Sequence, residues 1–150
     1  KNNDLIKVIY ENIDLLKKID NSINFKINNK TGKKVIINFD NEQFNRLFFN
    51  LIKNSIESIQ EKVKKTNKTL KNIDIEINQR RDYITVNLID SGEGFKNKKT
   101  KDIIKPYYTT KEKGTGLGLS IVDKIINDHN GSIKFLNTND GAKVQIIIPK

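Results

Sequence analysis

The apolar residues of this chain recur at two different spacings, and the wider one, of three or four residues, predicts helices. Asp4 is placed to cap the first helix, and Asp40 with Gln43 three residues later makes a capping box at the start of the second, the longest. The pair Asn130-Gly131 gives the third helix a C-terminal stop. The predicted helices cover residues 4–19, 41–65 and about 117–129.

The narrower spacing, an alternation of apolar and polar residues, predicts strands. Turn residues at Thr31-Gly32, in "QRRD" and in "TNDG" join these strands into three successive hairpins. Since hairpins build antiparallel pairs, we expect a mixed, largely antiparallel sheet with the helices on one face. The six predicted strands cover residues 23–28, 34–39, 73–77, 84–88, 132–137 and 142–148.

One long segment follows neither spacing. From Ser91 to Gly116 the chain is dominated by lysines, glycines and one Pro-Tyr-Tyr run. A loop of that length inside a compact domain is usually functional or mobile. We therefore expect part of the function to lie in this loop.

Composition places the chain among globular domains and excludes several kinds of site. With 150 residues, of which 35% are hydrophobic and 31% charged, it fits a single domain with its own core. Zero cysteines exclude disulfides and thiolate metal sites, and the one histidine, His129, argues against a histidine metal cluster or a Ser-His-Asp triad. No run is long and apolar enough to cross a bilayer. The helical pattern begins at the very start, so we expect a piece of a longer protein.

The net charge of +10, mostly from lysine, is compatible with a nucleic-acid or anionic membrane partner. The lysines are nevertheless scattered among asparagines and isoleucines, a composition that an AT-rich genome also imposes. We interpret the charge as a solvated basic surface and expect no nucleic-acid partner.

One edge of the long predicted helix carries four polar residues at helical spacing, opposite its apolar arc: Asn50, Asn54, Glu57 and Glu61. Such an edge is ordinarily a solvated face. Asparagine is a mediocre helix former, however, and two amide oxygens one turn apart can bind one magnesium ion from the same side. The pattern alone leaves both interpretations open.

The stretch "LIDSGEGF" places Asp90 directly after a buried strand, followed by Gly92 and Gly94. A turn that leaves a strand is the ordinary interpretation. The functional alternative is a carboxylate held at the strand end to accept hydrogen bonds from a planar amine. The glycines would then let a flat ring lie against the backbone.

The stretch "GTGLGL" has Gly114, Gly116 and Gly118 at every second position and leads into the third helix. The free N–H groups and the dipole of a helix N-terminus together favour an anion. The pattern matches neither the P-loop nor the dinucleotide fingerprint. These glycines are therefore either a tolerated helix start or a means for phosphate to approach the backbone.

In this order, the motifs resemble those of the catalytic, ATP-binding domain (Bergerat type) of two-component sensor histidine kinases. The same superfamily includes gyrase, heat-shock chaperone and mismatch-repair ATPases. "NLIKNSIES" is similar to the N box, "DSGEGF" to the first glycine box and "GTGLGLSIV" to the second. "KPYYTTK" resembles the segment before the ATP lid, and together with "DHNG" it is most similar to the nitrogen-regulation type. The resemblance covers almost the whole chain.

The resemblance implies an α/β (α+β) two-layer sandwich that forms one domain over residues 1–150, with a flexible ATP lid at about 96–116. It implies ATP and Mg²⁺ as ligands. Asn54 would hold magnesium and the phosphates, and Asn50, one turn earlier, would assist. These two asparagines are thus the implied catalytic and metal-binding residues.

The nucleotide base would be read at Asp90, which would accept from the adenine amino group, with Gly92 and Gly94 close to the base. The other residues implied in nucleotide binding are Glu57, Thr110, Lys111, Gly114, Thr115, Gly116, Leu117 and Gly118.

Two departures from the family pattern shape the expected reaction. The ATPase relatives carry a glutamate as general base where this chain has Asn50, which cannot take a proton, so we expect poor hydrolysis and favour phosphoryl transfer. The phosphoacceptor domain is missing, and His129 lacks the acidic neighbour of a phosphoacceptor, so we interpret it as a capping or packing residue.

The resemblance then implies transfer of the γ-phosphoryl group to a histidine on an adjacent dimerisation domain, for relay to the receiver domain of a response regulator. Homodimers would form only through that missing domain. The expected location is the cytoplasm, in a parent protein that can be anchored in the inner membrane. Two alternatives stay open: an anti-sigma-type serine kinase, and a nucleotide-sensing module that transfers nothing.

Overall fold

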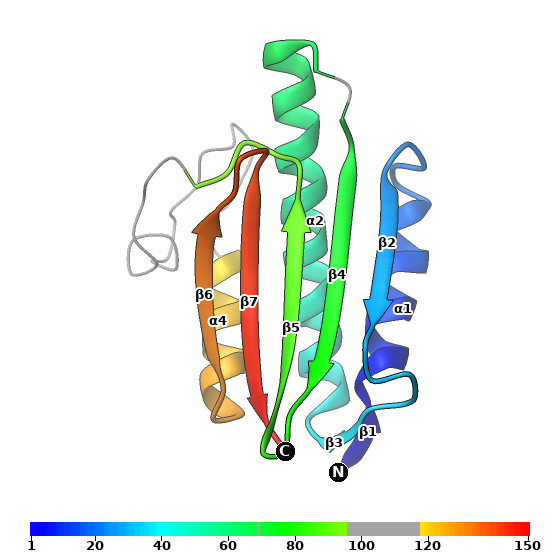
Figure 1. Ribbon diagram of the computed structural model, residues 1–150, viewed down its shortest axis with the longest axis vertical. Helices are drawn as coiled ribbons and strands as arrows, with labels where there is room; N and C mark the ends of the chain where they lie inside the picture. The colour runs from blue at the N-terminus through cyan, green and yellow to red at the C-terminus, as the bar shows by residue number, and fades with distance from the viewer. Residues whose placement is uncertain (69, 96–117) are drawn as a thin grey trace.

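The computed structural model describes residues 1–68, 70–95 and 118–150, and it has two layers, a sheet and a set of helices (Figure 1). The main sheet has the strand order β2-β4-β5-β7-β6. Its strands are β2 (Asn24–Asn29), β4 (Asn72–Gln79), β5 (Tyr83–Asp90), β6 (Ser132–Asn137) and β7 (Ala142–Pro149). The helices are α1 (Leu5–Lys17), α2 (Asn41–Thr66) and α4 (Gly118–Asp128).

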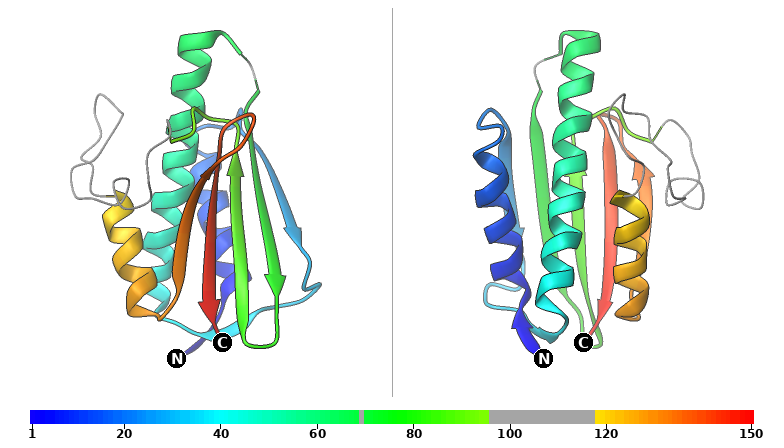
Figure 2. Two further views of the ribbon diagram at one scale, coloured as in Figure 1. Left: turned by 60° about the vertical axis from the view of Figure 1, so that its left-hand side comes forward. Right: turned by 180° about the vertical axis from the view of Figure 1, so that it is seen from behind.

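All three described helices lie side by side on the same face of the main sheet, with α2 in the middle (Figure 2). The strand residues that point toward them are the ones the alternation predicts to be apolar. Ile75, Val86 and Ile146, on three neighbouring strands, are each 1% exposed. The predicted two-layer sandwich with a mixed, largely antiparallel sheet is therefore confirmed. None of the helices in the described ranges is long and apolar enough to cross a membrane.

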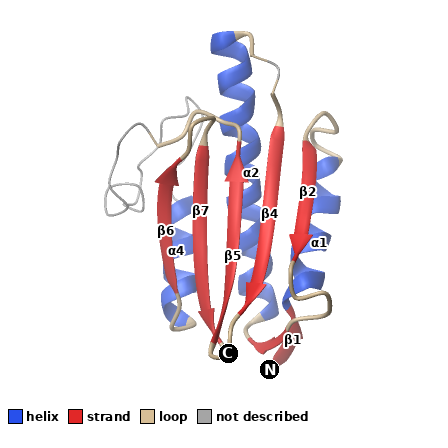
Figure 3. Ribbon diagram, in the orientation of Figure 1, coloured by secondary structure: helices blue, strands red, loops and turns tan. Residues whose placement is uncertain are grey.

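The predicted hairpin between the strands at residues 23–28 and 34–39 is wrong. β2 pairs with β4 in parallel, over six residue pairs from Asn24↔Asn72 to Asn29↔Ile77. The next strand, β3 (Ile36–Asn38), pairs instead with β1 (Asn2–Asp4), a short strand that the sequence pattern does not predict. β4 has eight residues and β3 only three, so β2 can form more backbone hydrogen bonds with β4 than with β3. In addition, Leu5 N–H donates to Val35 O at 2.9 Å, which holds the residues before β3 beside the start of α1. Figure 3 shows the small β1–β3 sheet below the main one.

The other two hairpins and the helix caps follow the prediction closely. β4 and β5 are antiparallel neighbours, as are β6 and β7. Asp4 caps α1 by accepting from Ile6 N–H at 3.1 Å, and Asp40 caps α2 by accepting from Gln43 N–H at 2.9 Å. The predicted capping box is only half right, because the Asp40 N–H donates to His129 Nε2 at 3.1 Å and not to the Gln43 side chain.

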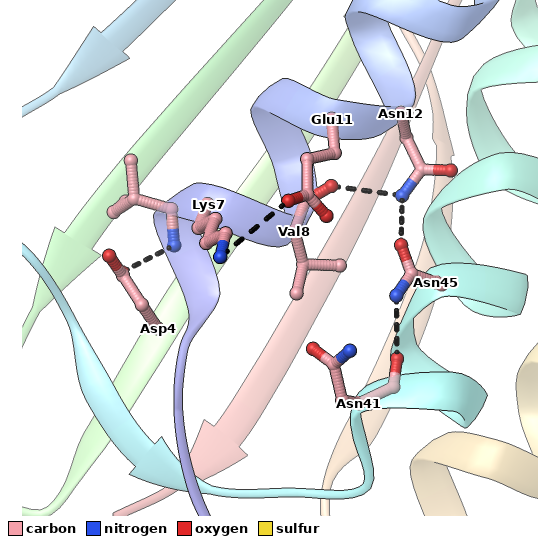
Figure 4. A network of polar contacts seen from close by, with 8 residues as sticks. Asp4, Lys7, Val8, Glu11, Asn12, Asn41 and Asn45 are labelled. Carbon is pink, nitrogen blue, oxygen red and sulfur yellow. Dashed lines mark hydrogen bonds and ion pairs between the residues drawn. The ribbon is translucent and has the colours of Figure 1, made fainter.

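A polar bridge joins the second half of α1 to the beginning of α2 (Figure 4). Asn12 on α1 is 4% exposed, and its side-chain amide donates both to Val8 O at 2.9 Å and to Asn45 Oδ1 on α2 at 3.1 Å. Asn45 in turn donates to Asn41 O at 2.9 Å. Because buried amides are stable only with partners, this chain of hydrogen bonds fixes how α1 lies along α2.

Candidate functional site

The predicted asparagine edge of α2 faces the start of α4. Gly118 is the first residue of α4, and a Cβ added to it would lie 3.6 Å from Asn54 Nδ2 and 3.7 Å from Asn50 Oδ1. The first N–H groups of a helix have no partner within the helix, and the dipole makes that end partly positive. The structure thus brings two amide side chains and an anion-favouring helix end into contact distance.

Asn50 is oriented by a hydrogen bond within its own helix. Its Nδ2 donates to Arg46 O at 2.9 Å, which leaves Oδ1 as the atom nearest to Gly118. An amide oxygen is the kind of ligand that Mg²⁺ takes, usually together with phosphate oxygens and water. Glu57, half-buried, follows Asn54 by about one turn on the same helix. The residues present therefore fit a hard cation that is shared with a phosphate group.

Asp90 ends β5 in the interior of the molecule, with only 6% of its surface exposed. Burial raises the pKa of its carboxyl group above the ordinary value. Three donors oppose that shift by stabilising the ionised form: the Gly92 N–H at 2.8 Å, the Ser55 hydroxyl and the Ala142 backbone N–H. The more distant charge of Lys62 acts in the same direction. The result is a buried carboxylate whose orientation is set by α2, by β7 and by its own loop.

The two glycines after Asp90 are required by packing inside the protein. A Cβ on Gly92 would lie 2.3 Å from Ser58 Oγ and 2.9 Å from Asp90 Oδ1. Gly94 has φ +77°, in the left-handed region, and a Cβ there would lie 2.7 Å from Asn137 Oδ1. The sequence interpretation explained these glycines by the approach of a flat ring, and the close approach that the structure shows is to α2 and to the β6–β7 turn.

The loop of residues 90–95 also contacts β4 and the β6–β7 hairpin. Ser91 Oγ accepts from Asn72 N–H at 2.9 Å and donates to Leu70 O at 3.1 Å. Beyond Gly94, Phe95 N–H donates to Asn137 Oδ1 at 2.7 Å, and the Phe95 ring packs edge-on against Phe135. The loop of residues 90–95 is therefore fixed in place by contacts with α2, β4 and the β6–β7 hairpin.

Sequence reasoning missed several residues that shape this site. Ser55 and Ser58 on α2 contact the loop, and Asn137 and Gly141 in the β6–β7 turn hold it from outside. A signal for Ser55 was present, because it is a polar residue on the otherwise apolar arc of α2 and is 4% exposed. The role of the β6–β7 turn depends on a contact between distant parts of the chain, so no local pattern could reveal it.

Part of the predicted site lies outside the described residues. This applies to the lid at about 96–116 and to six of the predicted nucleotide-binding residues: Thr110, Lys111, Gly114, Thr115, Gly116 and Leu117. Their roles stay predictions.

A hollow of about 280 Å³ opens next to the loop, lined by Lys62, Gly92, Glu93 and the turn at residues 137–141. A larger one, of about 540 Å³, lies around His129 and the start of α2, at the other end of that helix from the Asp90 loop. Among the described site residues, Gly92 lines the smaller hollow, Asn50 and Asn54 lie beside the start of α4, and none lines the larger hollow.

This arrangement agrees with what comparison with known proteins shows. Residues 39–150 match the family described as "Histidine kinase-, DNA gyrase B-, and HSP90-like ATPase". The chain belongs to this family. Within the family fold, α2 links the parts of the site: Asn50 and Asn54 lie beside the start of α4, and Ser58 binds the Asp90 loop.

The relatives that match include a sporulation kinase and a nitrogen regulation protein. The chain is 32% identical to sporulation kinase C of Bacillus subtilis over 148 residues, covering 98% of this chain and 32% of that protein. It is 34% identical to the nitrogen regulation protein NtrY of Azorhizobium caulinodans over 103 residues, covering 69% of this chain and 13% of that one. Among solved structures, the catalytic domain of the histidine kinase ThkA superposes with a TM-score of 0.85 at 28% identity, covering 100% of this chain and 95% of that one. The predicted membership of this family is therefore confirmed, and the chain spans less than a third of either named curated relative.

Proposed function

We propose that the chain is the ATP-binding catalytic domain of a sensor histidine kinase. It binds Mg-ATP and transfers the γ-phosphoryl group to a histidine of a dimerisation domain, from which the receiver domain of a response regulator takes it. The observation that carries the proposal is that Asn50 and Asn54 lie beside Gly118, the first residue of α4. Both asparagines stand on α2, the helix that also supports the Asp90 loop. The similarity to sporulation kinase C and to the histidine kinase ThkA supports phosphoryl transfer over hydrolysis.

The proposed roles follow from the chemistry of each group. Asn54 and Asn50 supply amide oxygens to Mg²⁺, whose charge neutralises the phosphates in phosphoryl transfer. The N-terminal end of α4 at Gly118 attracts the phosphate chain through the partial positive charge of the helix dipole. The Asp90 carboxyl group, held by three donors, accepts a hydrogen bond from the adenine amino group.

The chain itself offers no suitable phosphoacceptor among the described residues. His129 Nε2 accepts from Asp40 N–H, so Nδ1 carries the proton and donates to Ile125 O at 2.8 Å. Both ring nitrogens are thus occupied, and the ring packs on Phe44 at 4.6 Å between centroids. The interpretation of His129 as a capping and packing residue is confirmed by these contacts. We infer that the nucleophile comes from another domain.

The experiment is a transfer assay with γ-labelled ATP. The isolated chain should stay unlabelled, and addition of a dimerisation domain with its histidine should label that domain with an acid-labile phosphate. Asn54→Ala should abolish labelling, while the exposed Ser132→Ala on β6 should leave it unchanged. Label on the isolated chain, or on serine of an added protein, would favour the serine-kinase alternative, and binding without any transfer would favour a nucleotide-sensing module.

We propose further that the domain works in the cytoplasm, where ATP is available to it. Fractionation of cells that express the parent protein would show whether that protein is anchored in a membrane.

A further inference from the structure

Helix α2 turns two serines toward the Asp90 loop. Ser55 donates its hydroxyl hydrogen to the Asp90 carboxylate, and Ser58 Oγ accepts from Glu93 N–H at 2.8 Å. The two serines are three residues apart and therefore lie on the same face of the helix. They reach the two ends of the segment Asp90–Glu93, one at its carboxylate and the other at its last amide.

The contact at Ser58 is enforced by packing. Gly92 approaches so closely that a Cβ on it would lie 2.3 Å from Ser58 Oγ and 2.7 Å from Ser58 Cβ. A backbone that passes this close to the helix cannot shift toward it, and the hydrogen bond from Glu93 N–H prevents a shift away. Ser58 thus fixes the distance between α2 and the loop.

The contact at Ser55 fixes an orientation. A carboxylate has two oxygens that accept about four hydrogen bonds in total. Three protein donors, from Gly92, Ser55 and Ala142, leave the Asp90 carboxylate little freedom to rotate and about one acceptor position for a ligand. Without the Ser55 hydroxyl, the carboxylate would be held only by two backbone N–H groups.

Neither serine helps the helix in which it stands. Serine is a poorer helix former than alanine, and its hydroxyl competes for backbone hydrogen bonds inside a helix. Alanine at both positions would stabilise α2 more, so we attribute the two serines to the hydrogen bonds that their hydroxyl groups make with the loop.

We infer that Ser55 and Ser58 are positioning residues for the nucleotide base, which hold the Asp90 carboxylate at the place and angle that select an exocyclic amine. This inference rests on the proposed function, in which Asp90 accepts from the adenine amino group. The selected ligand is then a nucleotide with an amino group on its six-membered ring, and a nucleotide with a carbonyl oxygen at that position is rejected.

The test compares ATP with inosine triphosphate, which has an oxygen in place of the amino group. Titration of the isolated wild-type chain with each nucleotide and Mg²⁺ gives a preference ratio. Loss of one hydrogen bond from the positioning shell should lower ATP affinity by about fivefold in Ser55→Ala and in Ser58→Ala, and leave inosine triphosphate nearly unchanged. The preference ratio should fall accordingly. Ser132→Ala, which removes an exposed hydroxyl from β6, is the matched control and should keep the wild-type ratio.

Two further measurements distinguish positioning from a general loss of stability. Ser55→Ala removes a donor to the carboxylate, so the pH below which ATP binding weakens should move upward, whereas Ser58→Ala should leave that pH in place. Amide hydrogen exchange should become faster at Glu93 in Ser58→Ala and remain slow there in Ser55→Ala. Thermal unfolding of each variant checks that the fold persists.

The outcomes separate the inference from the function on which it rests. A wild-type chain that binds both nucleotides equally, or neither, would overturn the proposed role of Asp90 and this inference with it. A wild-type chain that prefers ATP, combined with serine variants that keep the same preference, would overturn the inference alone. Equal losses of affinity for both nucleotides would assign the serines to stability and reject the positioning role.

Discussion

At the scale of single residues, Asp90 is nearly inaccessible to solvent and is surrounded by hydrogen-bond donors, as a buried carboxyl group requires. Replacement by asparagine keeps the shape and removes the charge. Asp90→Asn should therefore keep the fold and lose ATP affinity by a free energy of about 2 kcal/mol or more, because a charged acceptor for the amino group is gone. Titration with a fluorescent ATP analogue, with circular dichroism as the check of folding, measures both. Equal affinities of the two proteins would remove Asp90 from the site.

The same residue predicts a dependence of stability on pH. Burial raises the pKa of Asp90 above its ordinary value of 3.8, so the folded chain holds this proton more tightly than the unfolded chain. Below that value both states are protonated, and as the pH rises from 3.8 through the folded pKa, the unfolded state ionises first and the fold loses stability. The unfolding free energy of wild type minus that of Asp90→Asn should therefore decrease over this window. Urea unfolding of both proteins at a series of pH values tests this, and a difference that rises with pH would contradict it.

Single residues also show how far sequence reasoning can reach. Asp90, Gly92 and Gly94 form a compact motif at a strand end, which is a local pattern of the sequence. Their actual contacts, with Ser58 and Asn137, come from helices and turns far along the chain. The motif itself can thus be recognised from residues adjacent in sequence, whereas the packing that requires its glycines becomes visible only in the folded molecule.

At the scale of elements, α4 is attached to α2 at both of its ends. Gly118 starts α4 beside the two asparagines, and His129, just past its last turn, bonds to the amide of Asp40 at the start of α2. His129→Ala would break two hydrogen bonds and remove a ring that packs on Phe44. We expect the unfolding free energy to fall by about 2 kcal/mol.

The measurement for His129→Ala is chemical denaturation, paired with a nucleotide titration. The affinity for ATP should stay close to that of wild type, since Gly118 and the asparagines lie at the opposite end of α4. Replacement of the exposed Asn127 by alanine, on the same helix, is a control that should change the stability little. An unchanged unfolding free energy in His129→Ala would reject the structural role given to this residue.

The elements themselves were largely predictable, and their pairing was less so. The caps at Asp4 and Asp40 and the alternation in β4 and β5 predict four elements, α1, α2, β4 and β5, within a few residues. The error over β2 and β3 arose because a turn at Thr31-Gly32 is compatible with a hairpin, whereas the choice of partner depends on the strands available elsewhere. Three polar residues, "NND", form β1, and nothing in their pattern predicts a strand.

At the scale of the whole molecule, the two layers give each strand one face toward the helices and one away from them. On β5, Ile84 points into the core with no exposed surface, and the next residue, Thr85, points away and is only half-buried. Ile84→Ala should lower the unfolding free energy by about 3 kcal/mol, because it leaves a cavity in the core. Thr85→Ala on the same strand is the matched control and should cost about 1 kcal/mol or less. Similar losses in both variants would contradict the one-sided burial of the sheet.

The parallel pairing of β2 with β4 has a consequence for the order in which the chain folds. Between these two strands lies the whole of α2, so their ladder closes a much longer loop than the β4–β5 and β6–β7 hairpins do. Contacts between residues far apart in sequence require a long loop to close, which costs entropy before any interaction energy is gained. Such contacts therefore slow folding. The β2–β4 ladder, like the pairing of β5 with β7 that spans even more of the sequence, should thus form after the two hairpins. Destabilising substitutions in β2 should then speed unfolding and leave the rate of folding almost unchanged.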